Sequence, residues 1–348
     1  MTIKGLTYHI FDEKGTCVLS VTAFASPACS AGTQRVTSMQ VIDRSLQPSQ
    51  YWPGLYALFG MDYERLAPIY TQFYDSKPSE KAFEEFMTER AGLGLAVQQP
   101  ELEPVQFDVP NEGYRTQVTH ASYGLAVAVS REAKDDNLYE DVGSRMMKEL
   151  AFSARQTEEY IAHAPLQVAV DAVNGNRADG VPLGSASHPT ATGLQSNLLV
   201  SANVSELAFE NAVIQISYAR NGRGFIINTM PKRVILSPES GPETRRILGS
   251  PLQWNSQTNN INVLRATGAL PEVVETPYLV DKDNYFIQTS EQDKDNGQGF
   301  TFWERTAVET REDSNWSNQA SLIALYFRCA ASVVDFRTVY VSPGADNV

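Results

Sequence analysis

Histidine and cysteine, the residue types that most often bind metals or act as nucleophiles, are few and scattered in this sequence. The histidines are His9, His120, His163 and His188. No two of them have the spacing of a helical zinc motif. The cysteines are Cys17, Cys29 and Cys329. They are odd in number and show no CxxC spacing, so neither a disulfide framework nor a metal site is expected.

Glycine-rich and acidic motifs also predict no catalysis. Gly222-Arg223-Gly224 resembles half of a dinucleotide-binding loop, but it follows a predicted helix and precedes a predicted strand, the reverse of the required order. The pairs Glu84-Glu85 and Asp135-Asp136 could supply acid–base chemistry, yet adjacent carboxylates point in different directions. No GxSxG or GK[ST] motif is present. We expect no enzyme and no cofactor, although an enzyme with a site assembled by tertiary structure stays open as an alternative.

Composition places the chain among ordinary globular proteins. It has 348 residues, of which 42% are hydrophobic and 20% charged. Its net charge of −13 arises from 41 acidic and 28 basic residues. Tight DNA binding is disfavoured, because lysine and arginine must replace the phosphate counterions. No segment approaches the ~18 apolar residues of a membrane span, and no signal-peptide core is present. We therefore expect synthesis in the cytoplasm and no membrane partner.

Residues 98–165 are the most informative segment, because they predict an acidic two-stranded ribbon that leads directly into a long helix. The ribbon contains Glu101, Glu103, Asp108 and Glu112, against one fixed positive charge, Arg115. It also contains apolar residues that its own fold could not cover, namely Val105, Phe107, Val109, Tyr114 and Val118. A solvated hairpin is the simpler interpretation. The length and apolar content of the ribbon favour a partner that covers it.

The long helix is predicted to begin near Ser130 and to end at Pro165, which supplies no amide hydrogen. Its apolar residues recur at helical spacing: Leu138, Val142, Met146, Leu150, Ala154, Thr157 and Ile161. At a rise of ~1.5 Å per residue, residues 138–164 would form a rod of roughly 40 Å.

Shorter patterns predict the remaining elements. Residues 1–50 are strand-like in short pieces, and residues 81–89 form a short helix or strand. Helices are predicted at 204–219 and 243–248. Strands are predicted at 225–227, 233–236, 261–275, 285–289, 300–310 and 333–341, whereas 316–327 could be either.

Taken in order, these segments resemble the major capsid proteins of tailed phages, which have the Hong Kong ninety-seven-like fold, and in particular the branch of the Mu-like head subunit. The resemblance covers roughly residues 50–345. The matching segments are 52–74, the return strand and helix start at 123–136, the helix middle at 147–158, the stretches 179–189 and 196–198, and the strand at 233–238. No single motif is specific, so the resemblance depends on their order.

The resemblance implies an α+β phage major capsid fold with distinct regions. These are an N-terminal arm (1–50), the start of the peripheral domain (51–92), an extended β-hairpin loop (93–129), the peripheral domain with its spine helix (130–203), an axial α/β domain (204–316) and a C-terminal return to the peripheral domain (317–348). Some members cross-link through a lysine in the extended loop. This sequence has no lysine between Lys81 and Lys134, so a non-covalent shell is expected.

The implied function is self-assembly into hexamers and pentamers of an icosahedral virion shell that encloses double-stranded DNA without binding it tightly. Assembly in the bacterial host cytoplasm, a separate scaffold, a portal and decoration or cement proteins are implied as well. An encapsulin-like bacterial compartment is the alternative. The predicted intersubunit contacts on the extended loop are Glu101, Glu103, Asp108, Glu112, Tyr114 and Arg115. Those on the spine side are Arg131, Arg145, Lys148 and Arg155.

Overall fold

The computed structural model describes residues 7–11, 17–22, 41–42, 55–87, 90–91, 93–99, 101, 104–105, 107–109, 111–130, 132, 140–171, 179–253, 260–266, 271–291, 299–314 and 320–345. The chain forms two compact units, Met1–Val41 and Ile42–Val348. In the first unit, β1 (Thr7–Phe11) pairs antiparallel with β2 (Cys17–Thr22), which confirms short strands near the start of the chain. The two-residue strand β3 (Val41–Ile42) spans the boundary between the units.

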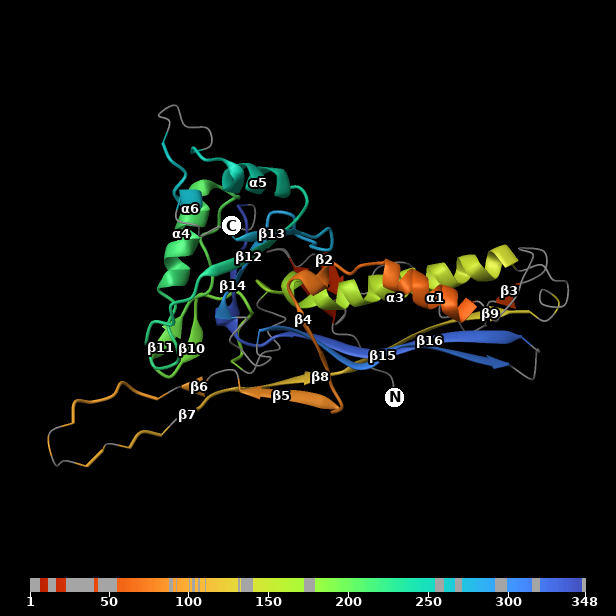
Figure 1. The fold of residues 1–348 in the computed structure, drawn as a ribbon, viewed down its shortest axis with the longest axis horizontal. Coiled ribbons are helices and arrows are strands. Elements are labelled where there is room, and N and C mark those ends of the chain that lie inside the picture. Colours follow the sequence, from red (N-terminus) through yellow and green to blue (C-terminus); the bar gives the residue numbers. More distant parts are fainter. Residues whose placement is uncertain are drawn as a thin grey trace. The chain divides into compact units, whose positions relative to one another are not determined.

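A long sheet and a long helix form one half of the second unit. The sheet contains β9 (Ala121–Val129), β16 (Ser321–Val333), β15 (Phe300–Ser314) and β4 (Asp75–Pro78), side by side in that order. The strand β16 is antiparallel to both of its long neighbours, and β4 is parallel to β15. The helix α3 (Glu140–Gln167) packs on β16, while α1 (Leu55–Arg65) and the 3-10 turn η2 (Tyr70–Gln72) pack on α3 (Figure 1).

A second sheet with its helices forms the other half. Its strands, in spatial order, are β13 (Glu272–Glu275), β12 (Pro231–Leu236), β14 (Tyr285–Thr289) and β17 (Val339–Ser342). The accompanying helices are α4 (Glu206–Ser217), α5 (Gly241–Gly249), α6 (Val263–Ala266) and the 3-10 turn η4 (Phe336–Thr338). The short strands β10 (His188–Thr190) and β11 (Gly193–Gln195) pair with each other.

The second sheet is a wall shared by two hydrophobic cores. Successive side chains of a strand point to opposite faces. Accordingly, Ile235 and Phe286 lie in the core that contains α3, whereas their neighbours Leu236, Tyr285 and Ile287 lie in the core that contains α4. All residues of β14 and β17 are buried. The two halves of the unit therefore meet through a continuous packed layer.

Two short ladders form a hairpin that continues from the long sheet. Its strands are β5 (Phe83–Met87), β6 (Arg90–Ala91), β7 (Asn111–Glu112) and β8 (Arg115–Thr119). The strands β5 and β8 pair antiparallel, and so do β6 and β7. Pairing therefore begins at Phe83, ten residues before the start of the extended loop predicted from the sequence, and β9 belongs to the long sheet rather than to the hairpin.

The α+β class is confirmed, and so are several individual elements: α4, α5, β12, β14 and β15 lie where their patterns predicted them. Residues 81–89, predicted as a short helix or strand, contain the strand β5. The ambiguous segment 316–327 contributes the strand β16 from Ser321 onwards. The predicted long helix is confirmed as α3 from Glu140, and most of its predicted first turns lie outside the described residues.

The predicted end of that helix at Pro165 was wrong, because α3 continues to Gln167. Proline lacks the amide that would bond to the preceding turn, which normally costs about 3 kcal/mol in a helix interior. Here Leu166 and Ala169 are buried in the core. Tertiary packing stabilises this last turn in spite of its missing hydrogen bond.

Two predicted strands were wrong. Residues 225–227 form only an isolated bridge, Arg220 to Ile226, because the side chain of Asn221 accepts the amides of Arg223 and Phe225 and closes a turn. Residues 261–275 contain α6 as well as β13, so they are not one strand. The predicted closing strand at 333–341 is interrupted by η4, and β17 begins only at Val339.

Candidate functional site

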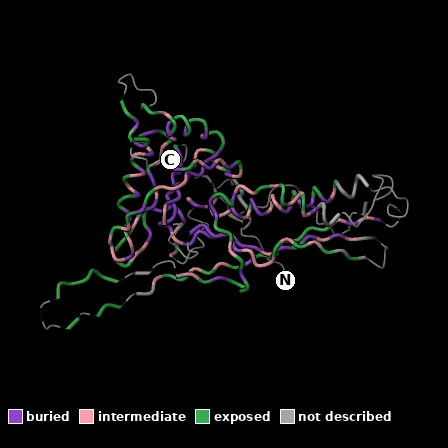
Figure 2. The backbone as a smooth tube through the Cα atoms, in the orientation of Figure 1, coloured by how far each residue is buried: buried purple, intermediate pink, exposed green. Residues whose placement is uncertain are grey.

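The hairpin presents a series of apolar side chains to solvent. Phe107 is 98% exposed. The other large apolar side chains that are exposed on the described part of the hairpin are Phe83, Leu93, Leu95, Val97, Val105, Val109 and Tyr114. Figure 2 shows the described part of the hairpin as mostly exposed. An apolar surface of this extent on a free subunit is typical of a site for protein–protein contact.

The charged residues predicted on the hairpin are not equivalent. Glu101 is exposed, and Arg115 is exposed at the start of β8 beside Tyr114. Asp108 forms an ion pair within its own chain: Arg223 Nη1 lies 2.8 Å from Asp108 Oδ2. The backbone of Glu112 lies in β7, whereas Glu103 lies outside the described residues.

The spine helix presents a basic and aromatic face. Arg145 and Lys148 are exposed, about two turns and one turn before the exposed ring of Phe152. Residues three, four and seven apart lie on the same side of a helix, so these side chains form one surface. Arg131, also predicted on this side, lies outside the described residues.

Arg155 has a different environment, because its guanidinium is engaged inside the subunit. It lies 3.4 Å from the centroid of the Tyr63 ring, and its Nε donates to Tyr63 O at 3.1 Å. Its Nη1 pairs with Glu158 Oε2 at 2.8 Å, and Tyr63 Oη donates to Glu158 Oε1 at 2.5 Å. This cluster fastens α1 to α3. Burial raises the pKa of Glu158 in spite of these two donors.

Glu159, the next residue, fastens η2 to the same helix. Its Oε1 accepts the amides of Ile69 and Tyr70. Burial raises the pKa of Glu159 as well. The two adjacent buried carboxylates therefore hold the segments that precede the hairpin.

His120 lies at the point where the hairpin joins the long sheet, between β8 and β9. It is buried, and neither ring nitrogen has a hydrogen-bond partner among the described residues. Burial lowers its pKa, so the ring is neutral at pH 7. Glu84, from the paired strand β5, is buried nearby and accepts from Ser79 Oγ at 2.7 Å and from Lys81 Nζ at 3.2 Å. The base of the hairpin, where it meets the long sheet, thus contains the buried polar side chains of His120 and Glu84.

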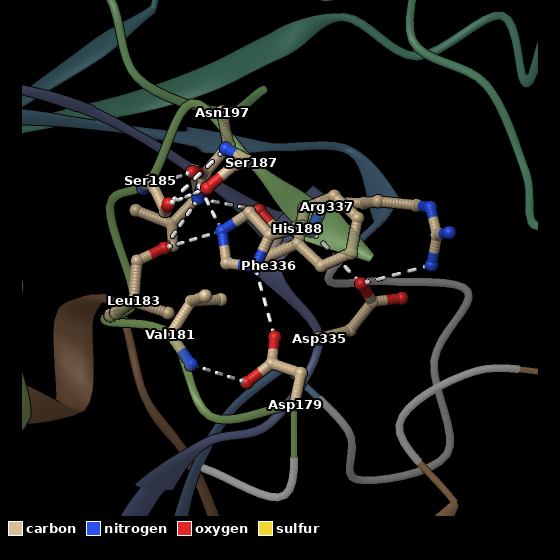
Figure 3. Close-up of polar contacts among 11 residues, drawn as sticks. Asp179, Val181, Leu183, Ser185, Ser187, His188, Asn197, Asp335, Phe336 and Arg337 are labelled. Atoms are coloured by element: carbon tan, nitrogen blue, oxygen red, sulfur yellow. Dashed lines mark hydrogen bonds and ion pairs between the residues drawn. The ribbon is translucent and has the colours of Figure 1, made fainter. Parts of the chain in front are cut away.

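A buried polar network fixes the stretch that follows the spine helix (Figure 3). Asn197 Nδ2 donates to the carbonyls of Leu183, Phe336 and Val339 at 2.7, 3.2 and 3.0 Å, and Asn197 Oδ1 accepts the amide of Ser185 at 2.9 Å. These bonds tie the segment to η4 and β17. From the sequence, residues 179–189 and 196–198 were identified only by their resemblance to the capsid family. The structure shows that their polar side chains form hydrogen bonds within the subunit.

His188 is the second centre of this network. Its Nδ1 lies 2.9 Å from Asp179 Oδ2, and its Nε2 lies 3.0 Å from Asn197 Oδ1 and 3.2 Å from the Leu183 carbonyl. The ring also stacks on Phe336, with centroids 4.1 Å apart. The result is a buried histidine–aspartate pair with a structural role.

We expect acid to destabilise the subunit through His163, which is fully buried on α3. Its Nδ1 donates to Glu159 O at 2.7 Å, its Nε2 accepts from Thr276 Oγ1 at 2.8 Å, and burial lowers its pKa to about 4. The unfolded chain, with the ordinary histidine pKa of about 6.5, therefore binds the proton first as the pH falls. The stability difference between wild type and His163→Gln should change between pH 6.5 and pH 4.

In that window, wild type should lose up to about 3 kcal/mol relative to His163→Gln, since one pKa unit corresponds to ~1.4 kcal/mol. Urea unfolding of both proteins at several pH values measures this difference. The raised pKa values of Glu158 and Glu159 act in the opposite direction. The comparison with the variant removes the contribution of groups that do not contact His163, whereas Glu159 Oε2 lies 3.6 Å from His163 Nδ1 and is measured together with it. A pH-independent difference would contradict the assignment.

Comparison with known proteins agrees with this architecture. The sequence profile described as "Phage capsid protein" matches residues 113–342. No curated protein sequence matches the chain. Two solved structures share the fold at a TM-score of 0.52: the capsid of a native GTA particle (15% identity, 93% of this chain and 100% of that chain) and a chain of Mycobacterium phage Patience (10% identity, 89% and 94%). An encapsulin complex from Synechococcus elongatus aligns at a TM-score of 0.44, with 11% identity, over 80% of this chain and 88% of that chain.

The chain belongs to the phage capsid protein family. It is a major capsid protein with the Hong Kong ninety-seven-like fold, a structural component of the virion shell that associates with copies of itself. Among the described residues, no group of three histidine, cysteine, aspartate or glutamate side chains could hold a metal ion. None of the described helices is long and apolar enough to cross a membrane.

Proposed function

We propose that the subunit assembles into hexamers and pentamers by laying its hairpin on the peripheral domain of the next subunit. The observation that carries this proposal is the series of exposed apolar side chains on the hairpin, led by Phe107. The receiving surface is the outer face of α3, where Phe152 offers apolar area and Arg145 and Lys148 offer positive charge. Glu101 on the hairpin supplies complementary charge, and Glu103, Glu112, Tyr114, Arg115 and Arg131 complete the set of proposed contacts.

Apolar burial, rather than charge, supplies most of the association energy in this proposal. Burying an exposed Phe or Leu side chain contributes about 1.5–3 kcal/mol, whereas an exposed ion pair contributes about 0–1 kcal/mol. The hairpin carries eight large exposed apolar side chains among its described residues. Each contact is repeated around a closed ring, so moderate energies per subunit accumulate. The shell holds without covalent links, because the hairpin contains no lysine for cross-linking.

The assembled shell encloses double-stranded DNA without gripping it. The net charge of −13 supports this, since an acidic lumen would repel phosphate and leave the genome free to enter and to leave. Assembly takes place in the bacterial host cytoplasm with a separate scaffold, a portal, and decoration or cement proteins as partners.

Reversing the charge of Glu101 tests the electrostatic part of the docking. Glu101→Lys should slow assembly and make its rate less sensitive to low salt, because charge on the rim of an interface acts mainly on association. Adding Lys148→Glu to the same chain should restore part of the rate. Light scattering at two ionic strengths follows both variants. If Glu101→Lys assembles at the wild-type rate at low salt, Glu101 does not take part in the contact between subunits.

Electron cryo-microscopy of the purified protein tests the function as a whole. The expected result is closed particles with hairpins crossing subunit boundaries, and particles from infected or lysogenic cells should contain nuclease-resistant DNA. Particles filled with a protein cargo and free of DNA would instead identify an encapsulin-like compartment. A protein that stays monomeric under all conditions would overturn the proposal.

A further inference from the structure

We propose that Arg223 is a positioning residue for assembly, which clasps Asp108 of its own hairpin and sets the direction in which the hairpin leaves the subunit. Arg223 Nη1 and Nη2 lie 2.8 and 3.1 Å from the two carboxylate oxygens of Asp108, and Nη2 also donates to Val109 O at 2.8 Å. The two residues are 115 positions apart, in the hairpin and in the turn that follows α4. This inference rests on the proposed docking function of the hairpin.

The turn that carries Arg223 is built to present it. Asn221 Oδ1 accepts the amides of Arg223 and Phe225 at 3.0 and 2.9 Å, and Gly224 N donates to Asn221 O at 3.0 Å. Gly224 has a φ of +85°, which an L-residue rarely adopts. Hydrogen bonds within the turn therefore fix the backbone that carries the Arg223 guanidinium. Less conformational entropy is then lost when the guanidinium pairs with Asp108.

The hairpin side of the clasp is equally specific. The amide of Gly94, from the opposite arm of the hairpin, donates to Asp108 Oδ2 at 2.6 Å. A Cβ atom on residue 94 would lie 3.1 Å from Asp108 Oδ2 and 3.3 Å from Arg223 Nη1, closer than side chains usually tolerate. Asp108 thus joins both arms of the hairpin to one guanidinium. The Gly94 amide and Arg223 lower the pKa of Asp108, which keeps it charged.

The clasp orients the hairpin without covering its apolar side chains. Phe107 and Val109, on either side of Asp108, remain exposed while Asp108 is held. The same pairing removes Asp108 from the acids available to a neighbouring subunit. Because the pair is solvent-exposed and screened by salt, it is reversible. We infer a subunit that presents its docking surface in one direction and can still adjust that direction as the ring closes.

Hydrogen exchange of the unassembled full-length subunit tests the clasp directly. Arg223→Gln and Asp108→Asn should each increase exchange at the Gly94 amide several-fold, and the double variant should exchange no faster than the single variants, because both remove one shared contact. Arg245→Gln is the matched control, since it breaks an exposed ion pair with Glu275 far from the hairpin. Exchange at Gly94 that stays at the wild-type rate in Arg223→Gln would overturn the clasp.

Assembly of the same variants tests the positioning role. Arg223→Gln should give fewer closed shells and more irregular aggregates at a concentration where wild type and Arg245→Gln assemble fully. Normal shells from Arg223→Gln would overturn the role even if exchange at Gly94 rises. Phe107→Asp separates this proposal from the docking function: it should keep Gly94 protected and yet fail to assemble. If Phe107→Asp forms normal shells, Phe107 lies outside the subunit contacts and the docking proposal loses its leading observation, whatever the state of the clasp.

Discussion

Phe107→Asp should abolish shell formation while leaving the folded subunit intact. The side chain is 98% exposed in the subunit, so nothing inside the fold depends on it, and surface substitutions of this kind usually change stability by less than about 0.5 kcal/mol. At a subunit contact the same change forfeits about 2–3 kcal/mol of apolar burial and places a charge in a desolvated site. Each 1.4 kcal/mol weakens a contact about tenfold, and the loss recurs at every position in the ring.

Size-exclusion chromatography with light scattering and negative-stain microscopy measure this effect. Phe107→Leu is the matched control, because it keeps an apolar side chain at the same position and should assemble at close to the wild-type yield. The urea midpoint of the Phe107→Asp subunit should stay unchanged. Closed shells from Phe107→Asp at the wild-type yield would show that Phe107 lies outside the subunit contacts.

Asn197→Ala should destabilise the subunit by about 3–6 kcal/mol, the largest effect we expect from one polar substitution. Asn197 is 1% exposed and makes hydrogen bonds to the backbone of residues 183, 185, 336 and 339. The alanine variant would leave several of these buried groups unpaired, at a cost of about 1–3 kcal/mol each. Such a loss is a large part of a typical stability of about 5–15 kcal/mol.

Equilibrium urea unfolding in a Phe107→Asp background measures this loss on subunits that do not assemble. Ser196→Ala is the matched control, since Ser196 is exposed and its hydroxyl bonds, among the described residues, to the backbone of Leu198 nearby. The control should lose less than about 1 kcal/mol. A loss equally small in Asn197→Ala would mean that water or backbone adjustment satisfies the exposed carbonyls.

The sequence predicted local elements better than their connections. The helix α4 has a Ser205 cap and an apolar pattern, and β14 is a short run of apolar and aromatic residues between turns, so both are decided by their own residues. Pro165 misled the prediction because its helix is stabilised by buried side chains, which local propensity does not describe. The hairpin base was placed too late because the partner of β8 depends on pairing across about 30 residues.

The charged residues of the candidate interface show the same limit. The sequence identified Asp108 and Arg155 as charged groups, but their partners, Arg223 and Tyr63 with Glu158, are fixed by tertiary structure. The turn at Asn221 was recognised, yet its role in presenting Arg223 had no signal in the local pattern. Asn197 carried no chemical motif, because it bonds mostly to backbone groups that any residue could supply, and His188 carried none because tertiary structure brings Asp179 and Asn197 to it.

The wall shared by the two cores has a mechanical consequence for a growing shell. Alternate residues of β12, β14 and β17 are locked into opposite cores, so neither half can tilt without disrupting both packings. Strain from curvature must then be absorbed elsewhere. We infer that the hairpin, held through Asp108 by its ion pair with Arg223, is the more compliant element, whereas the two cores that share the second sheet move as one body. Subunits built this way would adapt to hexamers and pentamers by changing the direction of the hairpin, while the packing of the two cores stays the same.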